Sequence, residues 1–236
     1  MSRLRLKARF AMLVLACLPA LALARSQPDF PPPPDASVKW VGKDMSMNGL
    51  PMQMRQFVTR KTPDKVARFY RKKWKHGENG QQGYVETSAM APWRLITRVE
   101  DGYLLTVQFQ KTDFGGTWGY LAMSPLPDPK AGKPVLGKGI PKIPGSQVMS
   151  DIGSRDVGQS GHTVMLINKH SLASNVSFYR HYYGHAGWHS EDDRVVAAGH
   201  THLLSFKKWR KSVKIIVTGA KEGSRVVVNT VTHDLL

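Results

Sequence analysis

An internal repeat constrains the fold of this chain more than any other feature of its sequence. The tripeptide Phe-Tyr-Arg occurs at residues 69–71 and again at residues 178–180, each time within an amphipathic segment. The numbering of the two copies differs by 178 − 69 = 109, and the same offset superposes Thr62 on Ser171 and His76 on His185. Similarity at one fixed offset is typical of duplicated structural units. The sequence therefore predicts two halves with the same order of elements.

Each half is expected to contain one short strand, a helix and three further strands, since apolar and polar residues alternate over short runs between turn signals. In the first half the expected strands are residues 52–57, 94–99, 103–110 and 118–123. Their counterparts are residues 164–167, 202–207, 213–218 and 225–231. Asp101-Gly102 is a typical hairpin turn, whereas Glu222-Gly223 and Lys211-Ser212 are weaker turn signals.

The two expected helices share a capped start and an apolar stripe. Thr62 is a good N-cap and is followed by Pro63 at the first helical position. At helical spacing the first stripe comprises Val66, Phe69, Tyr70 and Trp74, and the second comprises Leu172, Val176, Tyr179 and Tyr183. Gly184 is expected to end the second helix.

These elements predict an α+β protein built from two tandem β-α-β-β-β modules, each a helix packed on a small antiparallel sheet. The modules are expected at residues 38–123 and 148–236. A proline-rich tether at 25–37 precedes them, and a Pro/Gly-rich linker at 124–147 joins them. Modules of this size are marginal alone, so they are expected to dock, either sheet edge to sheet edge or helix to helix.

The segment 1–24 is typical of a secretory signal. A basic start precedes an apolar run, and Ala22-Leu23-Ala24 offers the small-x-small pattern of a cleavage site. Cleavage after Ala24 predicts a periplasmic or secreted protein that begins at Arg25. One alternative is lipidation at Cys17, and another is an uncleaved N-terminal anchor.

Composition excludes several classes of protein. Hydrophobic residues make up 41% of the 236 residues, which is enough for a core and argues against wholesale disorder. The single cysteine excludes an internal disulfide framework and a Cys-rich metal site. Lys and Arg number 34 against 17 Asp and Glu, so the formal net charge is +17. Such a charge favours anionic partners but carries no information about fold.

No motif identifies a reaction, so the sequence indicates a protein that is not an enzyme. Residues 132–139 resemble a phosphate-binding loop, but glycine stands where that motif needs Ser or Thr, and prolines follow instead of a helix. Residues 158–162 (Gly-Gln-Ser-Gly-His) fail the nucleophile-elbow pattern at its last position. The acidic run Glu191-Asp192-Asp193 is expected in a solvated turn.

Histidine and methionine clusters leave a metal-binding function open. The histidines that show ligand-like spacing are His181, His185, His189, His200 and His202. Met45, Met47, Met52 and Met54 form two Met-x-Met pairs around Asn48-Gly49. Imidazoles suit Zn²⁺ and Cu²⁺, and thioethers suit Cu⁺. The alternative interpretation is solvated loop histidines, with methionines that fill a core beside a hairpin turn.

Basic residues around aromatic rings are the remaining signal. One group lies on the first helix near Trp74, and includes Arg68, Arg71, Lys72, Lys73 and Lys75. The other surrounds Trp209, and the candidate site for an anionic surface comprises Lys207, Lys208, Trp209, Arg210 and Lys211. These lysines could instead serve solubility alone.

The sequence thus favours a non-enzymatic exported accessory or binding protein of the cell envelope. Its expected partner is an anionic glycan, an anionic lipid or another envelope protein, with no specific nucleic acid, no cofactor and no transmembrane segment in the mature chain. The alternative is a periplasmic protein that binds copper or zinc.

Overall fold

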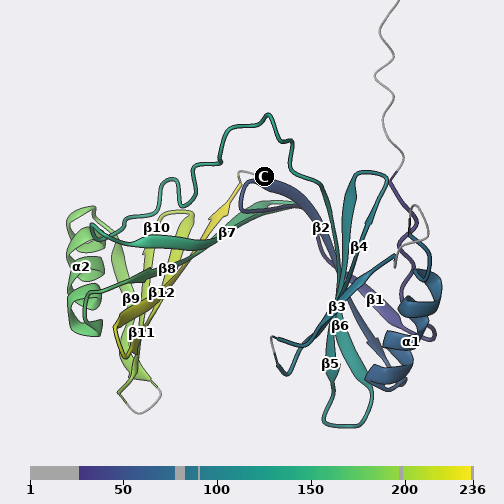
Figure 1. Cartoon of the computed structure of the whole chain (residues 1–236). Helices are drawn as coiled ribbons and strands as arrows, with labels where there is room; N and C mark the ends of the chain where they lie inside the picture. Colours follow the sequence, from purple (N-terminus) through teal and green to yellow (C-terminus); the bar gives the residue numbers. More distant parts are fainter. Residues whose placement is uncertain (1–26, 78–82, 90, 197–198, 235–236) are drawn as a thin grey trace, which may run out of the picture.

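The computed structural model describes residues 27–77, 83–89, 91–196 and 199–234. The expected signal sequence, Cys17 and Arg25 therefore lie outside the described residues. Within them, twelve strands form one antiparallel sheet in the order β3-β4-β5-β6-β2-β1-β7-β8-β12-β11-β10-β9 (Figure 1). The strands of the first half are β1 (Ser37–Met47), β2 (Leu50–Thr59), β3 (Val85–Thr87), β4 (Arg94–Glu100), β5 (Tyr103–Lys111) and β6 (Thr117–Pro125). Those of the second half are β7 (Gln147–Asp156), β8 (Gln159–Asn168), β9 (His189–Val196), β10 (Thr201–Lys208), β11 (Lys211–Ala220) and β12 (Gly223–His233).

The expectation of two tandem β-α-β-β-β modules of the α+β class is wrong. The structure is mostly sheet, and its two described helices are α1 (Pro63–Lys73) and α2 (Leu172–His185). Each half contributes six strands in the order β-β-α-β-β-β-β to one continuous sheet. The halves meet where β1 pairs with β7, from Asp44 opposite Arg155 to Met47 opposite Ile152. Edge-to-edge pairing was one of the two docking arrangements that the sequence left open.

Sequence patterns missed β1, β3, β7 and β9, and the two of these that join the halves, β1 and β7, have no clean alternation of buried and exposed residues. β1 contains Gly42 and has register shifts on either side of it. β7 contains Ser150, Gly153 and Ser154, and its register shifts near Ser150. β1 and β7 bury few side chains, so their place in the sheet follows from backbone pairing with β2, with β8 and with each other.

The duplication extends beyond the matching tripeptides. β2 and β8 begin at Leu50 and Gln159 (159 − 50 = 109), and the two helices begin at Pro63 and Leu172 (172 − 63 = 109). Phe57 and Leu166 occupy equivalent buried positions on β2 and β8. Both hairpins before them turn at a glycine with positive φ, Gly49 or Gly158. The sheet is therefore two copies of one unit related by pairing at β1 and β7.

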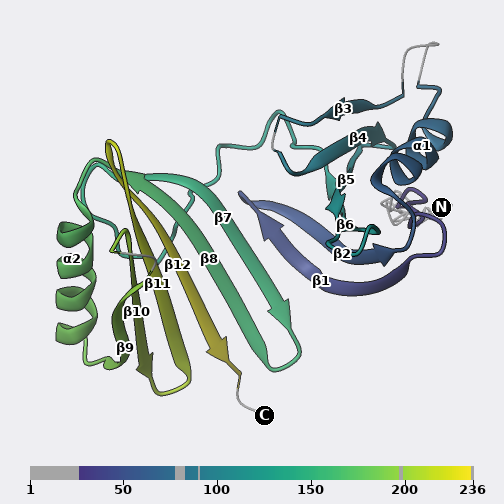
Figure 2. The ribbon, with the colours of Figure 1, turned by 90° about the horizontal axis from the view of Figure 1, so that it is seen from below.

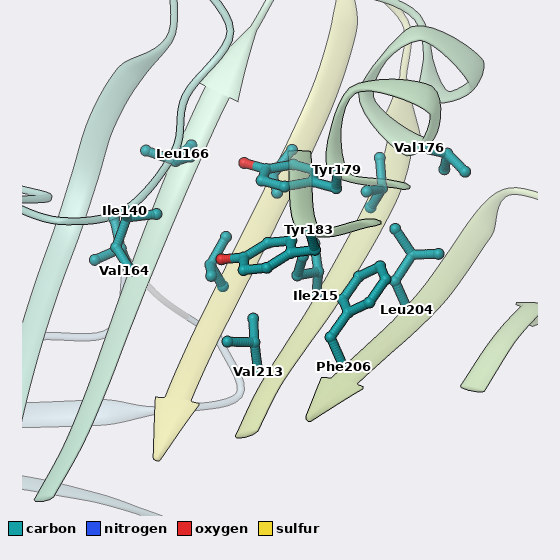
Figure 3. Packing of buried hydrophobic residues seen from close by; sticks show 13 residues of the cluster. Ile140, Val164, Leu166, Val176, Tyr179, Tyr183, Leu204, Phe206, Val213 and Ile215 are labelled. Carbon is teal, nitrogen blue, oxygen red and sulfur yellow. The ribbon is translucent and has the colours of Figure 1, made fainter. Parts of the chain in front are cut away.

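The two helices cover the outer sides of the two halves, so the helix-free faces are turned toward each other (Figures 1 and 2). We call these helix-free faces the inner face. Side chains alternate along each strand, so residues beside the buried ones point to the inner face. In the second half, Val176, Tyr179 and Tyr183 of α2 pack on buried residues of β8, β10, β11 and β12 (Figure 3). In the first half, Val66, Tyr70 and Trp74 make the equivalent core contacts.

Parts of the proline-rich tether and linker are packed on these cores. Phe30 is buried, and its ring centroid lies 5.8 Å from that of Trp74. Ile140 is buried in the second core. Tyr70 and Tyr179 donate hydrogen bonds to the carbonyls of Pro31 and Pro141. The two segments are therefore equivalent parts of the repeated unit, because each covers the end of its own core.

Several local predictions differ from the structure. The helix α2 continues through Gly184, and Gly187 adopts positive φ after it. The expected turn at Lys211-Ser212 lies two residues earlier, at Trp209-Arg210, because β11 begins at Lys211. The turn at Asp101-Gly102 is confirmed, with φ of 51° and 80°. Among the residues that the structure describes, no helix has the length and apolar character needed to span a bilayer.

Candidate functional site: the Trp209 hairpin

The five residues of the predicted anionic-surface site form the turn between β10 and β11, and we call them the Trp209 hairpin. Trp209 is 88% exposed, although the indole is the largest apolar side chain. Its φ is +54°, a left-handed conformation that bulky residues rarely adopt. Trp209 thus combines an exposed ring with a backbone conformation that is costly for a bulky side chain. Such positions are often retained for binding.

The basic side chains of the Trp209 hairpin have different surroundings. The Lys208 ammonium donates a hydrogen bond to the Ala186 carbonyl at 2.6 Å, so it caps the end of α2. Lys207 lies 3.9 Å from a carboxylate oxygen of Glu191. Arg210 and Lys211 have no side-chain hydrogen bond or ion pair with another described residue. These two are therefore the cations best placed to meet a ligand beside the Trp209 ring.

Two cations of the basic group on the first helix are paired with carboxylates, whereas the exposed Arg68, Lys72 and Lys75 have no ion pair with another described residue. Arg71 makes two hydrogen bonds with Glu86 at 2.7 and 2.9 Å. Lys73 lies 3.2 Å from Asp29. Trp74, the aromatic residue of this group, is only 1% exposed, so its ring cannot stack on a ligand. The hydrophobic core holds this indole, because it follows the apolar stripe of α1 at helical spacing.

The acidic run at residues 191–193 lies in the edge strand β9 and not in a turn. Asp193 accepts two hydrogen bonds from Arg180, both at 2.6 Å, and lies 2.6 Å from Nε2 of His202. Hydrogen bonding to the Arg180 guanidinium lowers the pKa of Asp193 below its ordinary value, with a smaller contribution from His202. Glu86 in β3 makes the equivalent contacts with Arg71 and Arg94. Each half thus attaches its edge strand to its helix by a carboxylate between two basic groups.

The metal-ligand candidates are mostly dispersed. The rings of His181 and His185 lie side by side on α2, with centroids 3.9 Å apart. His189 begins β9, while His202 is buried against Asp193. Within the described part of the chain, no group of three His, Cys, Asp or Glu residues is close enough to hold a metal ion. Met45 and Met52 face each other across the β1–β2 hairpin, and the turn at Asn48-Gly49 has positive φ at both residues.

The two enzyme-like motifs have structural roles. The resemblance to a phosphate-binding loop lies in the linker, where no helix follows. The Gly137 amide donates a hydrogen bond to Asp151 at 2.6 Å, and Asp151 also lies 2.7 Å from Nε2 of His162. Gly158 turns the β7–β8 hairpin. The Asp151 carboxylate therefore ties the linker to β8.

An aromatic cluster on the inner face of the first half was missed by sequence reasoning. The ring centroid of Trp93 lies 4.8 Å from that of Trp118 and 6.0 Å from that of Tyr120. Trp118 and Tyr120 alternate with the buried Leu121 on β6. That alternation could have predicted an aromatic face opposite the core. No sequence pattern predicted that Trp93, in the loop before β4, would join it.

No known protein-family model, curated protein or solved structure matches this chain.

Proposed function

We propose that this chain is a non-enzymatic exported binding protein of the cell envelope, which contacts an anionic lipid or glycan surface through the Trp209 hairpin. The observation that carries the proposal is the exposed Trp209 ring between cationic side chains at the tip of a hairpin. Tryptophan is favoured at interfaces because its ring is apolar and its N–H is polar. Each Lys or Arg near an anionic membrane contributes about 1 kcal/mol of attraction.

The formal charge supports the proposal only in part. The expected mature chain has a net charge of 17 − 4 = +13, because residues 1–24 carry four basic side chains, and it is attracted to polyanions whatever its function. If the hairpin is a local site, removing two positive charges there should weaken binding more than removing two positive charges elsewhere. The hairpin offers such a comparison, since Lys133 and Lys138 in the linker are exposed lysines without an aromatic neighbour in the sequence.

The experiment measures binding to vesicles of phosphatidylglycerol, to vesicles of phosphatidylcholine and to soluble polygalacturonate. Arg210→Ala with Lys211→Ala should weaken binding to phosphatidylglycerol by about tenfold or more, given about 1 kcal/mol for each cation. Lys133→Ala with Lys138→Ala removes the same charge and should have a small effect. Polygalacturonate distinguishes an anionic glycan from a lipid headgroup. Equal small losses from both double variants would contradict the proposal and favour a protein partner.

The Trp209 ring has its own matched control in Phe114, which is 100% exposed at the turn between β5 and β6. Trp209→Asn should weaken vesicle binding, whereas Phe114→Asn should not. Because asparagine tolerates positive φ, Trp209→Asn should also raise the free energy of unfolding by about 1 kcal/mol. A more stable variant that binds less would be the expected signature of a residue retained for function. Unchanged binding would remove the ring from the proposed site.

Export is the other part of the proposal. We expect the mature protein to begin at Arg25, because Ala22-Leu23-Ala24 fits a cleavage site. Mass spectrometry of the protein from its native host tests this expectation. A lipid on Cys17 or an intact N-terminus would contradict it.

A further inference from the structure

The inner face of the first half carries an uncharged row of side chains across three strands. Gln108 on β5 and Gln56 on β2 both face Tyr120 on the strand between them, β6. Directly opposed side chains in an antiparallel pair lie about 5 Å apart, so an amide flanks the phenol ring on each side. We call these three residues the glutamine row. It continues to Leu95 on β4 at one end and to Lys39 on β1 at the other.

Next to the glutamine row, the indoles of Trp93 and Trp118 complete an aromatic surface. The centroids of Trp118 and Tyr120 lie 5.7 Å apart, with the ring planes at 74°. All three rings are partly exposed. The surface therefore presents ring faces and ring edges together with two side-chain amides.

The polar groups of this surface have no protein partner within the described residues. No side-chain hydrogen bond between described residues involves the amides of Gln56 and Gln108 or the hydroxyl of Tyr120. In the second half, polar side chains of the same face bind one another, as Asn229 does with Thr163 at 2.7 Å. The glutamine row thus keeps its donors and acceptors available on a half-buried face.

The repeat supplies an internal comparison for the row. The equivalent residues follow from the strand pairing, and are Met165 for Gln56 (165 − 56 = 109), Val227 for Tyr120 (227 − 120 = 107) and Ile216 for Gln108 (216 − 108 = 108). Met165 and Ile216 are 41% and 42% exposed. The same row of the same unit is therefore aliphatic in the second half. The fold itself does not require amides or a phenol at these positions.

We propose that the glutamine row, with Trp93 and Trp118, is a binding site for an uncharged oligosaccharide. The apolar C–H face of a pyranose ring can pack on an aromatic ring, while its hydroxyls exchange hydrogen bonds with planar amides. The uncharged row matches a neutral chain and offers no cation for phosphate or carboxylate except the terminal Lys39. This site differs from the Trp209 hairpin in residues, location and ligand charge.

The test uses neutral hexasaccharides of β-1,4-linked glucose and of β-1,4-linked N-acetylglucosamine, with binding measured by calorimetry and by tryptophan fluorescence. Binding of either one should be insensitive to salt, unlike the attraction of anionic vesicles to the hairpin. Gln56→Met with Gln108→Ile gives the first half the side chains of the second and should weaken binding by about tenfold, as loss of two hydrogen bonds implies. Trp118→Ala should weaken it by at least as much.

The matched control is Met165→Gln with Ile216→Gln, which changes the equivalent row and should leave sugar affinity unchanged. Because each swap uses residues that the fold already accepts at that row, both variants should keep the thermal midpoint of the parent within a few degrees. Absence of binding by the parent protein at about 5 mM sugar would overturn the proposal. Equal sugar affinity of the parent protein and the double variant Gln56→Met with Gln108→Ile would overturn it too. So would a result in which these rings bind a proline-rich decapeptide and not the sugar. Loss of vesicle binding in the hairpin variants would bear only on the proposed function.

Discussion

Tyr70 and Tyr179 make the same contact at equivalent positions of the two repeats, since 179 − 70 = 109. Each phenol donates a hydrogen bond to a proline carbonyl in the segment that precedes the first strand of its own half, to Pro31 at 2.9 Å and to Pro141 at 3.2 Å. Both phenols are protonated donors at neutral pH, and burial raises the pKa of each further above its ordinary value. The contact holds a proline-rich segment over each core.

Removing one of these phenolic oxygens should lower stability by the value of one buried hydrogen bond. We expect Tyr179→Phe to reduce the free energy of unfolding by about 1 kcal/mol in urea denaturation. Tyr182→Phe is the control, because Tyr182 is an exposed neighbour on the same helix. Equal effects from the two substitutions would show that the bond to Pro141 contributes nothing.

The same packing predicts where a protease cuts the linker. Cleavage should fall at residues 126–136, which are almost entirely exposed, and should spare residues 137–146. Ile140 is buried there, and Ser146 accepts a hydrogen bond from Asn168. Limited proteolysis with mass spectrometry locates the cut.

After that cut the two fragments should remain together, because β1 and β7 still pair. Size-exclusion chromatography of the nicked protein measures this directly. Two fragments that elute separately at native conditions would contradict the continuous sheet.

The ion pair of Asp193 predicts a dependence of stability on pH. Because Arg180 lowers the pKa of Asp193 in the folded state, this carboxylate stays ionised after the unfolded chain has taken up a proton. Its contribution should be complete above the unfolded pKa of about 4 and should disappear as the pH falls through the lower folded pKa. We expect Asp193→Asn to cost about 1 kcal/mol at pH 7, since the pair is partly exposed.

The measurement compares urea unfolding of Asp193→Asn and the parent between pH 7 and pH 2. The difference between the two free energies should shrink at the acid end. Asp192→Asn is a matched control on the same strand, because Asp192 forms its ion pair with the exposed Arg194 at 3.2 Å. A difference that grows as the pH falls would contradict the assigned role of Arg180.

Features that depend on neighbours along the chain were predictable from the sequence. The helix starts at Pro63 and Leu172, the hairpin at Asp101-Gly102 and the constant offset between the repeats all follow from local spacing and turn residues. The Ser171 side chain caps the second helix, whereas the Thr62 side chain makes no capping hydrogen bond. The cluster of charge around Trp209 was also predictable from the sequence, because residues at the tip of a hairpin are neighbours in the chain.

Only long-range packing decides which strands share the sheet. It also decides which side chains of the inner face meet across strands that are not consecutive in the chain. β1 and β7 lack a strong apolar pattern, and their pairing joins residues far apart in the chain, as with Met47 and Ile152. Alternation on β6 indicates that Tyr120 points away from the core, but the register with β2 and β5 places Gln56 and Gln108 beside it. A turn can fix the register within a hairpin such as β5–β6, but β2 and β6 are not consecutive in the chain, so no turn sets the register between them.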